Sequence, residues 1–182
     1  AGIMEPEITV GADNKAELIT INMGRPSFNR SEIPMEGADG RVLNEDLCVD
    51  GENWKITSLL MGVPHTVTYV DDVDTVDIEK TGPLFEKHEA FPKHTNINFA
   101  QQMDDRTVKV RTWERGAGAT LACGTGSCSV AVASFLNGRT GREVDIQLPL
   151  GTLHIEYREE DGNVYMTGPA AVSFTGTWPD ET

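Results

Sequence analysis

The alternation of apolar and polar residues along the chain predicts a series of short strands. Residues 107–113 alternate most clearly, and 96–102 alternate enough for a strand. Further strands are predicted at 16–22, 54–60, 66–70, 144–148, 152–157, 164–166 and 171–175. A short helix is expected over 78–87, interrupted near Gly82 and Pro83. Residues 24–52 are rich in glycine and proline and are interpreted as a loop-rich connector.

One segment differs from the rest, because residues 127–136 carry no charge and place apolar side chains on every side. A helix with this pattern is a buried one, and Asn137 with Gly138 supplies its end. Counted from the glycines before it, the helix is expected at about 125–137. Strands and helices do not alternate regularly along the chain. The sequence therefore predicts an α+β fold, in which a mostly antiparallel sheet wraps around this central helix.

The composition narrows the class of protein. The 182 residues carry a formal net charge of -14, which argues against nucleic acid or an anionic membrane as a partner. No apolar run is long enough to span a bilayer and no leader is recognised, so a cytoplasmic enzyme is expected. The spacing of the three cysteines and four histidines predicts neither disulfides nor a metal site. The glycine runs match neither common nucleotide-binding loop.

Cys123 is the strongest candidate for chemistry. It directly precedes the apolar helix, and Gly124 and Gly126 follow it. The unpaired N–H groups and the dipole of a helix N-terminus favour a thiolate, so a lowered pKa is predicted for Cys123. The glycines also leave those N–H groups open to the carboxylate of a ligand. The alternative is a small buried thiol without a chemical role, which is our interpretation of Cys128; Cys48 is not expected to react.

Four further residues are weaker candidates. Glu114 and Arg115 lie where a strand ends, shortly before Cys123. An arginine can hold a carboxylate through two parallel hydrogen bonds, whereas the alternative is an exposed ion pair of little energetic value. His65 follows a tight Gly-x-Pro turn, and from the residues alone it is more readily a structural histidine. Asn96 begins a strand and is a candidate for binding a polar ligand.

Several motifs occur in one order along most of the chain and closely resemble those of the diaminopimelate epimerase family. They are Met61-Gly62-Val63-Pro64-His65, Thr95-Asn96-Ile97-Asn98-Phe99, Trp113-Glu114-Arg115-Gly116-Ala117-Gly118, Ala122-Cys123-Gly124-Thr125-Gly126-Ser127-Cys128 and Tyr165-Met166-Thr167-Gly168-Pro169-Ala170. The resemblance implies the epimerase fold and the cofactor-independent conversion of LL-diaminopimelate to meso-diaminopimelate. This reaction serves lysine and peptidoglycan precursor biosynthesis.

The resemblance also implies roles for particular residues. Family members use two cysteines on opposite faces of the substrate, where one removes the α-proton as a thiolate and the other returns a proton as a thiol. Cys123 matches the second of these cysteines. Glu114 matches a position close to the reacting centre and in contact with the substrate, and Arg115 and Asn96 match other substrate contacts. Gly124 and Thr125 match the residues whose N–H groups hold the α-carboxylate. His65 matches a histidine important for activity.

The sequence departs from the family pattern in two places. Val63 stands where relatives have an asparagine, so one substrate contact is altered. The Cys-Gly-Asn-Gly-type motif of the first cysteine is missing. We therefore expect residues 1–35 to be a remnant of the N-terminal domain, 36–168 the C-terminal domain, and 169–182 a terminal strand that returns to the N-terminal domain.

These departures make the N-terminal portion of the enzyme an expected partner, and the chain alone is expected to be inactive. A homodimer is left open. Two other functions also remain open from the sequence. One is a different two-base isomerase of the same superfamily, such as a proline racemase-like or phenazine-biosynthesis-like enzyme. The other is a non-catalytic domain that binds an anion at the helix end. No cofactor is expected under any of these readings.

Overall fold

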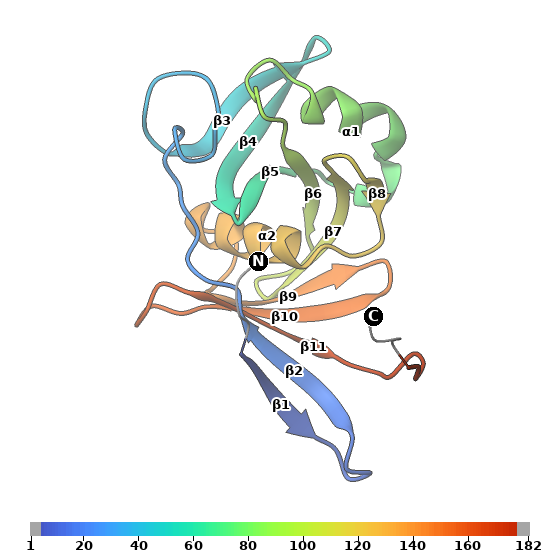
Figure 1. The fold of residues 1–182 in the computed structure, drawn as a ribbon. Helices are drawn as coiled ribbons and strands as arrows, with labels where there is room; N and C mark the ends of the chain where they lie inside the picture. The colour runs from blue at the N-terminus through green and yellow to red at the C-terminus, as the bar shows by residue number, and fades with distance from the viewer. Residues whose placement is uncertain (1–4, 178–182) are drawn as a thin grey trace, which may run out of the picture.

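The strands of the chain form a mixed sheet that curves around a helix (Figure 1). A computed structural model describes residues 5–177. The strands are β1 (Pro6–Val10), β2 (Ala16–Asn22), β3 (Val42–Val49), β4 (Glu52–Met61), β5 (Val63–Tyr69), β6 (Asn96–Gln102), β7 (Thr107–Glu114), β8 (Gly118–Thr120), β9 (Glu143–Leu148), β10 (Gly151–Tyr157) and β11 (Val164–Pro169). The helices are α1 (Ile78–Glu86), α2 (Gly124–Leu136) and a short 3-10 helix, η1 (Val73–Thr75).

The strand order brings distant parts of the sequence together. Along the main path the order is β1-β2-β11-β10-β9-β7-β6-β5-β4-β3, and β8 pairs with β7. Within the described residues, β5 pairs with β6 in parallel and β7 with β9 in parallel, whereas the other strand pairs are antiparallel. The prediction of a mostly antiparallel sheet is confirmed.

Helix α2 lies between the upper strands β4–β7 and the lower strands β9–β11, and it packs against both groups (Figure 1). Its side chains from Gly126 to Ser134 are buried. Two of its buried hydroxyls bond to backbone carbonyls one turn earlier, Ser127 to Cys123 and Ser129 to Thr125. Because these polar groups are satisfied inside the helix, they can be buried at low cost. The predicted central helix at about 125–137 is confirmed.

Helix α1 covers a second apolar cluster on the outer side of β6 and β7. Phe85 and Phe99 pack edge to face there, with their ring centroids 5.9 Å apart. The expected interruption near Gly82 and Pro83 is wrong, since α1 is continuous through Pro83. Proline removes one intrahelical hydrogen bond, and the burial of Ile78 and Phe85 on either side of it stabilises the helix.

Two other expectations are corrected by the structure. The connector expected at 24–52 contains β3, an edge strand whose exposed positions include Asn44 and Asp46 as well as the apolar Leu43. The strand expected at 171–175 is absent, since β11 ends at Pro169 and no helix or strand is assigned in 170–177. The last part of the expected 169–182 strand, residues 178–182, lies outside the described residues. In the described part of the chain, no helix is long and apolar enough to cross a membrane.

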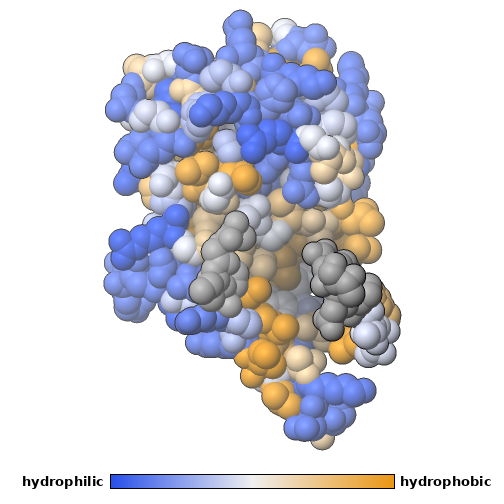
Figure 2. All heavy atoms as spheres, in the orientation of Figure 1, coloured by the Kyte–Doolittle hydropathy of each residue, from blue (hydrophilic) through white to orange (hydrophobic). Residues whose placement is uncertain are grey.

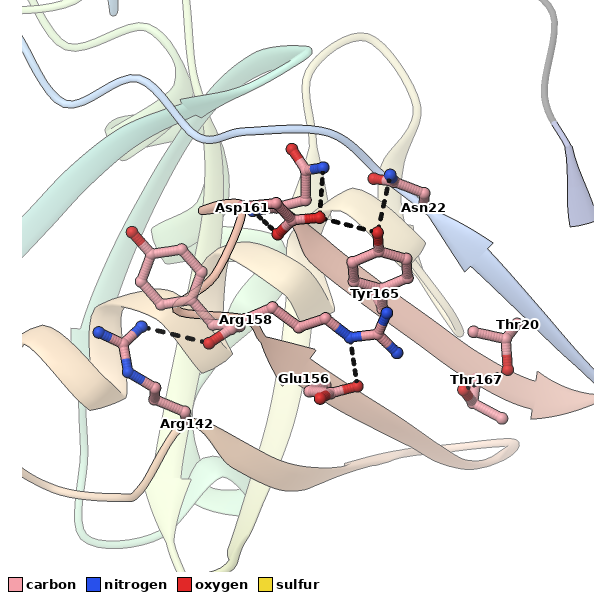
Figure 3. A network of polar contacts seen from close by, with 10 residues as sticks. Thr20, Asn22, Arg142, Glu156, Arg158, Asp161, Tyr165 and Thr167 are labelled. Atoms are coloured by element: carbon pink, nitrogen blue, oxygen red, sulfur yellow. Dashed lines mark hydrogen bonds and ion pairs between the residues drawn. The ribbon is translucent and has the colours of Figure 1, made fainter. Parts of the chain in front are cut away.

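The lower part of the sheet, formed by β9–β11 together with β2 and β1, has two different faces. On one face, polar side chains of β2 and β11 bond to each other, Thr20 to Thr167 and Asn22 to Tyr165, and Glu156 of β10 bonds to Arg158, which follows that strand (Figure 3). On the other face, α2 covers β9–β11.

The apolar face continues past α2 onto β2 and β1. Strand register places Ile155, Met166 and Ile21 side by side there, with Ile19 and Ile8 paired one step along. Ile155 is fully buried, but Ile8 is 56% exposed. Apolar side chains gather over the β1–β2 end of the molecule in Figure 2. The apolar face thus extends beyond the helix that covers it.

Candidate active site

Cys123 caps the N-terminus of α2. Its backbone is extended, with φ of -140° and ψ of 107°, and its Sγ accepts a hydrogen bond from the Gly126 N–H at 3.4 Å. A Cβ added to Gly126 would lie only 2.6 Å from Asn98 Oδ1, so a glycine is required for this close approach. The N–H groups of Gly124 and Thr125 are in the first turn, where a helix offers no carbonyl to accept them. This helix end can therefore receive an anion beside the thiol.

His65 lies next to this helix end because of the sheet register. Strands β5 and β6 are parallel, and His65 lies opposite Asn96. The His65 Nε2 is 3.0 Å from the hydroxyl of Thr125, which in turn is 3.6 Å from Cys123 Sγ. The three side chains therefore form a continuous hydrogen-bonded line from the sheet to the thiol.

Asn98 determines the direction of this line. Its Oδ1 accepts from the Thr112 hydroxyl and its Nδ2 donates to the Thr66 carbonyl, so the orientation of its amide is fixed. The same Nδ2 lies 3.3 Å from His65 Nδ1, which must accept the bond. The ring proton of a neutral His65 is then on Nε2 and is donated to Thr125, whose own proton is free to point at the thiol.

Sequence reasoning missed Asn98, although one signal was available. Asn96 and Asn98 are two residues apart on one strand, so both side chains project to the same face of the sheet. Asn96 Nδ2 is 3.4 Å from His65 Nε2, the longest of the ring contacts. Because Asn96 Oδ1 accepts the Arg115 N–H, this contact sets one N–H group against another when the ring proton is on Nε2, and it is then not a hydrogen bond.

His65 is neutral in the folded chain. It is fully buried, and its pKa is lowered from 6.5 to about 3, chiefly because burial disfavours the charged ring and secondarily because Arg115 is positively charged. A second ring proton on Nδ1 would also point at the Asn98 amide nitrogen, which offers no lone pair. The imidazole is therefore an uncharged hydrogen-bond donor rather than an acid.

The pKa predicted for Cys123 is wrong in direction. Burial raises the pKa of the thiol above its ordinary value, and the nearby Glu114 carboxylate raises it further. The hydrogen bonds from Thr125 and Gly126 lower the pKa, but they do not compensate for burial. Cys123 is 6% exposed. The side chain is consequently a thiol at neutral pH.

Glu114, Arg115 and Asn96 meet on the other side of the site. The Glu114 carboxylate accepts a hydrogen bond from the Thr120 hydroxyl at 2.6 Å. Asn96 Oδ1 accepts the backbone N–H of Arg115 at 2.6 Å, so these two candidates are directly joined. The Arg115 guanidinium is exposed and donates to the carbonyl of Lys93 at 2.7 Å. It lies at the rim of the site and is not paired with a carboxylate there.

The remaining cysteines differ from Cys123. Cys128 is fully buried in the α2 core, with a pKa raised to about 12 mainly by burial, whereas Cys48 is exposed on β3. Residues 5–177 contain no group of three or more histidine, cysteine, aspartate or glutamate side chains that could hold a metal ion. The chemistry that this site can perform is therefore carried by a buried thiol, a neutral histidine and a helix N-terminus.

The fold is that of known amino-acid epimerases and racemases. A hydroxyproline epimerase from Agrobacterium vitis superposes with a TM-score of 0.66 at 14% identity, covering 92% of this chain and 54% of that one. A probable proline racemase from Agrobacterium radiobacter K84 superposes with a TM-score of 0.65 at 13% identity, covering 96% and 58%. At these identities the similarity defines the fold alone.

Sequence comparison defines the family. The model of diaminopimelate epimerase matches residues 57–173. Diaminopimelate epimerase from Pelotomaculum thermopropionicum is 48% identical over all 182 residues, and that from Heliobacterium modesticaldum is 46% identical over 179 residues, or 98% of the chain. The chain belongs to the diaminopimelate epimerase family. It spans 64% of the length of each of these two relatives.

Proposed function

We propose that this chain supplies one half of the active site of a diaminopimelate epimerase, with the Cys123 thiol as one of two proton-transferring groups. The single observation that carries the proposal is the line from His65 through Thr125 to Cys123 at the N-terminus of α2. A thiol held in a buried site next to open backbone N–H groups is suited to exchanging a proton with a carbon beside a carboxylate.

The proton balance of the reaction assigns a role to the thiol. Removal of the α-proton leaves an electron pair that spreads into the substrate carboxylate, and a proton delivered to the opposite face completes the inversion. Cys123 has a raised pKa and therefore holds its proton. In the conversion of the LL-isomer it returns this proton to the α-carbon, and it becomes a thiolate that must be reprotonated.

The helix end stabilises the negative charge that develops on the substrate. In the proposed complex, the N–H groups of Gly124 and Thr125 bind the α-carboxylate, and the positive end of the α2 dipole lies next to them. Thr125 then acts twice, through its N–H on the substrate and through its hydroxyl on the thiol. Neutral His65 fixes the Thr125 hydroxyl without adding a charge of its own.

Glu114, Arg115 and Asn96 bind the remainder of the substrate in this proposal. Diaminopimelate has a second ammonium and a second carboxylate at its far end. The Glu114 carboxylate lies beside the Cys123 thiol and suits the ammonium group at the reacting centre. The exposed Arg115 guanidinium at the rim suits the far carboxylate once it leaves the Lys93 carbonyl. By the family resemblance, Val63 stands where relatives usually have an asparagine, so the side chain at this position is proposed to make no polar contact with the substrate.

The second proton-transferring group is proposed to come from the N-terminal portion that the longer relatives possess. A Cβ placed on Gly124 would be 3.1 Å from Met166, so the start of α2 is in close contact with β11. The apolar face of β1 and β2 lies beyond this point. A domain that covers this face would lie next to Cys123. In this arrangement 1–35 belong to the N-terminal domain, 36–168 form the C-terminal domain, and 169–182 return toward the N-terminal one.

Complementation tests the proposal. The N-terminal portion of the Pelotomaculum thermopropionicum enzyme is mixed with this chain, and both inversion of LL-diaminopimelate and incorporation of solvent deuterium at the α-carbon are followed. Activity is expected from the mixture and not from either part alone. Replacement Cys123→Ala is expected to lower the rate by about 10²–10⁴-fold, the usual contribution of one acid–base group.

A matched control uses the exposed thiol, since Cys48→Ala is expected to leave the rate unchanged. Full activity of the Cys123→Ala mixture would refute the role of the thiol. Inversion by this chain alone would refute the division of the site. Parallel assays with proline and hydroxyproline test the second candidate, a proline racemase-like isomerase. Failure of every substrate, with anion binding retained, would favour the non-catalytic domain.

A further inference from the structure

Glu86 is a buried carboxylate that has no part in the proton transfer described above. It is the last residue of α1 and is 7% exposed. One carboxylate oxygen accepts the indole N–H of Trp113 at 2.7 Å, and the other accepts the backbone N–H of Gly116 at 3.3 Å. His94 Nδ1 lies 3.5 Å from the second oxygen. Both oxygens are therefore bound to other segments of the chain.

The location of this carboxylate is unfavourable by itself. The C-terminal end of a helix carries a partial negative charge, and burial removes the carboxylate from water. Burial raises the pKa of Glu86, but the hydrogen bonds from Trp113, Gly116 and His94 lower it by more, so the net pKa lies below its usual value. The side chain is thus ionised at neutral pH, and its N–H donors account for its stability there.

The segments that Glu86 joins carry the candidate substrate contacts. Trp113 and Gly116 flank Glu114 and Arg115, where β7 ends and the turn to β8 begins. The backbone carbonyl of Glu86 accepts the N–H of Thr95, the residue before Asn96. The end of α1 is therefore bonded to both segments.

Helix α1 is docked closely enough to transmit this constraint. A Cβ added to Gly82 would lie 2.5 Å from the Trp113 ring, so backbone and indole are in direct contact. The turn itself has one internal backbone bond, from the Ala117 N–H to the Glu114 carbonyl at 3.0 Å. Its tip is exposed, and it is bonded to the rest of the molecule through Glu86, Asn96 and the carbonyl of Lys93.

We propose that Glu86 is a positioning residue for the substrate site: its carboxylate clamps the 114–117 turn to α1 and so holds Glu114 and Arg115 beside the Cys123 thiol. This inference rests on the proposed function for its catalytic consequence. The clamp itself is a property of the folded chain and can be measured without any reaction.

Replacement Glu86→Gln tests the clamp. Glutamine keeps the shape of the side chain but loses the charge, and it turns an NH2 group toward one of the two N–H donors. Hydrogen exchange of the 113–118 segment is expected to become about tenfold faster or more, since bonds to charged acceptors are among the stronger ones. In the complemented enzyme, kcat/KM is expected to fall by a similar factor, while the melting transition stays cooperative.

A matched control is Glu79→Gln, which removes an exposed carboxylate from the first turn of the same helix. It is expected to change neither exchange in the turn nor activity. Should Glu86→Gln fail to fold, Trp113→Phe removes the indole donor together with the second ring, and it keeps an aromatic ring against Gly82. It is expected to accelerate exchange in the same segment by a smaller factor.

The outcomes separate the clamp from the reaction. Unchanged exchange in the turn with either folded variant would refute the clamp, as would faster exchange spread over the whole chain. Faster local exchange with unchanged kcat/KM would refute the positioning role. If the mixture that retains Glu86 has no epimerase activity, the proposed function fails, and the exchange measurement still decides whether Glu86 holds the turn.

Discussion

Mild acid is expected to destabilise the folded chain through His65. The ring is fully buried and binds a proton with a pKa of about 3 when folded, compared with 6.5 for an ordinary histidine. The unfolded chain therefore takes up a proton first as the pH falls below about 6.5. The stability that depends on the neutral ring is fully present above that pH, and it is lost progressively as the pH falls toward 3.

The size of the effect follows from the two pKa values. Between about pH 7.5 and about pH 5, the unfolded state gains nearly one proton at this position while the folded state gains almost none. Linkage gives a loss of about 2 kcal/mol in the free energy of unfolding. This is a large share of the roughly 5–15 kcal/mol that stabilises an ordinary domain.

The assay compares the chain with His65→Gln, which cannot be protonated in this range. Urea unfolding followed by tryptophan fluorescence gives the free energy of unfolding at about pH 7.5, 6 and 5. The difference between the two proteins is expected to shrink by about 2 kcal/mol across the series, because the other ionisable groups are common to both. Parallel curves for the two proteins would refute the reasoning, since they would mean that His65 is as easily protonated in the folded chain as in the unfolded one.

Two further changes test the packing and the hydrogen bonds at the helix end. Gly126→Ala places a Cβ 2.6 Å from Asn98 Oδ1 and is expected to lower the free energy of unfolding by about 1–3 kcal/mol in urea titrations. Gly141→Ala, which meets no atom within 4 Å, is its control, and equal losses would contradict the close contact. Thr125→Val removes a bond that lowers the pKa of Cys123, so alkylation by iodoacetamide at fixed pH should slow, about tenfold for each unit of pKa. Thr125→Ser should keep the original rate, and an unchanged rate in the valine variant would exclude the hydroxyl as a partner of the thiol.

Strands and helices with one dominant pattern could be predicted from the sequence. Strand β6 was predicted at its observed bounds, and β7 to within one residue, because their alternation reflects one buried face. Helix α2 was predictable because its uncharged sequence suits only a buried position. Strand β3 was not predictable in the same way. It is an edge strand with Asn44 at a φ of 53°. Its polar residues lie where the edge meets solvent, so they do not alternate regularly with apolar ones along the strand.

Most residues of the candidate site could be predicted from the sequence, but the direction of the pKa shift of Cys123 could not. The sequence identifies Cys123 at a helix start, and the structure places it there. Its pKa depends on how deeply the sheet and Glu114 enclose the thiol, which local sequence does not contain. The contact between His65 and Thr125 joins residues 60 positions apart, one on strand β5 and the other in the first turn of α2, so it too depends on the complete fold.

The pairing of β2 with β11 has a consequence for how the protein is made. Thr20 and Thr167 bond across a separation of 147 residues, so β2 has no partner on that side until nearly all of the described chain has been synthesised. Until then the nascent chain exposes an unpaired strand edge beside Ile19 and Ile21. Contacts between such distant residues close slowly, and unpaired edges are sites where growing chains associate wrongly. Strand β11 therefore leaves the ribosome long after β2. Correct folding depends on keeping the free edge of β2 unoccupied until β11 arrives.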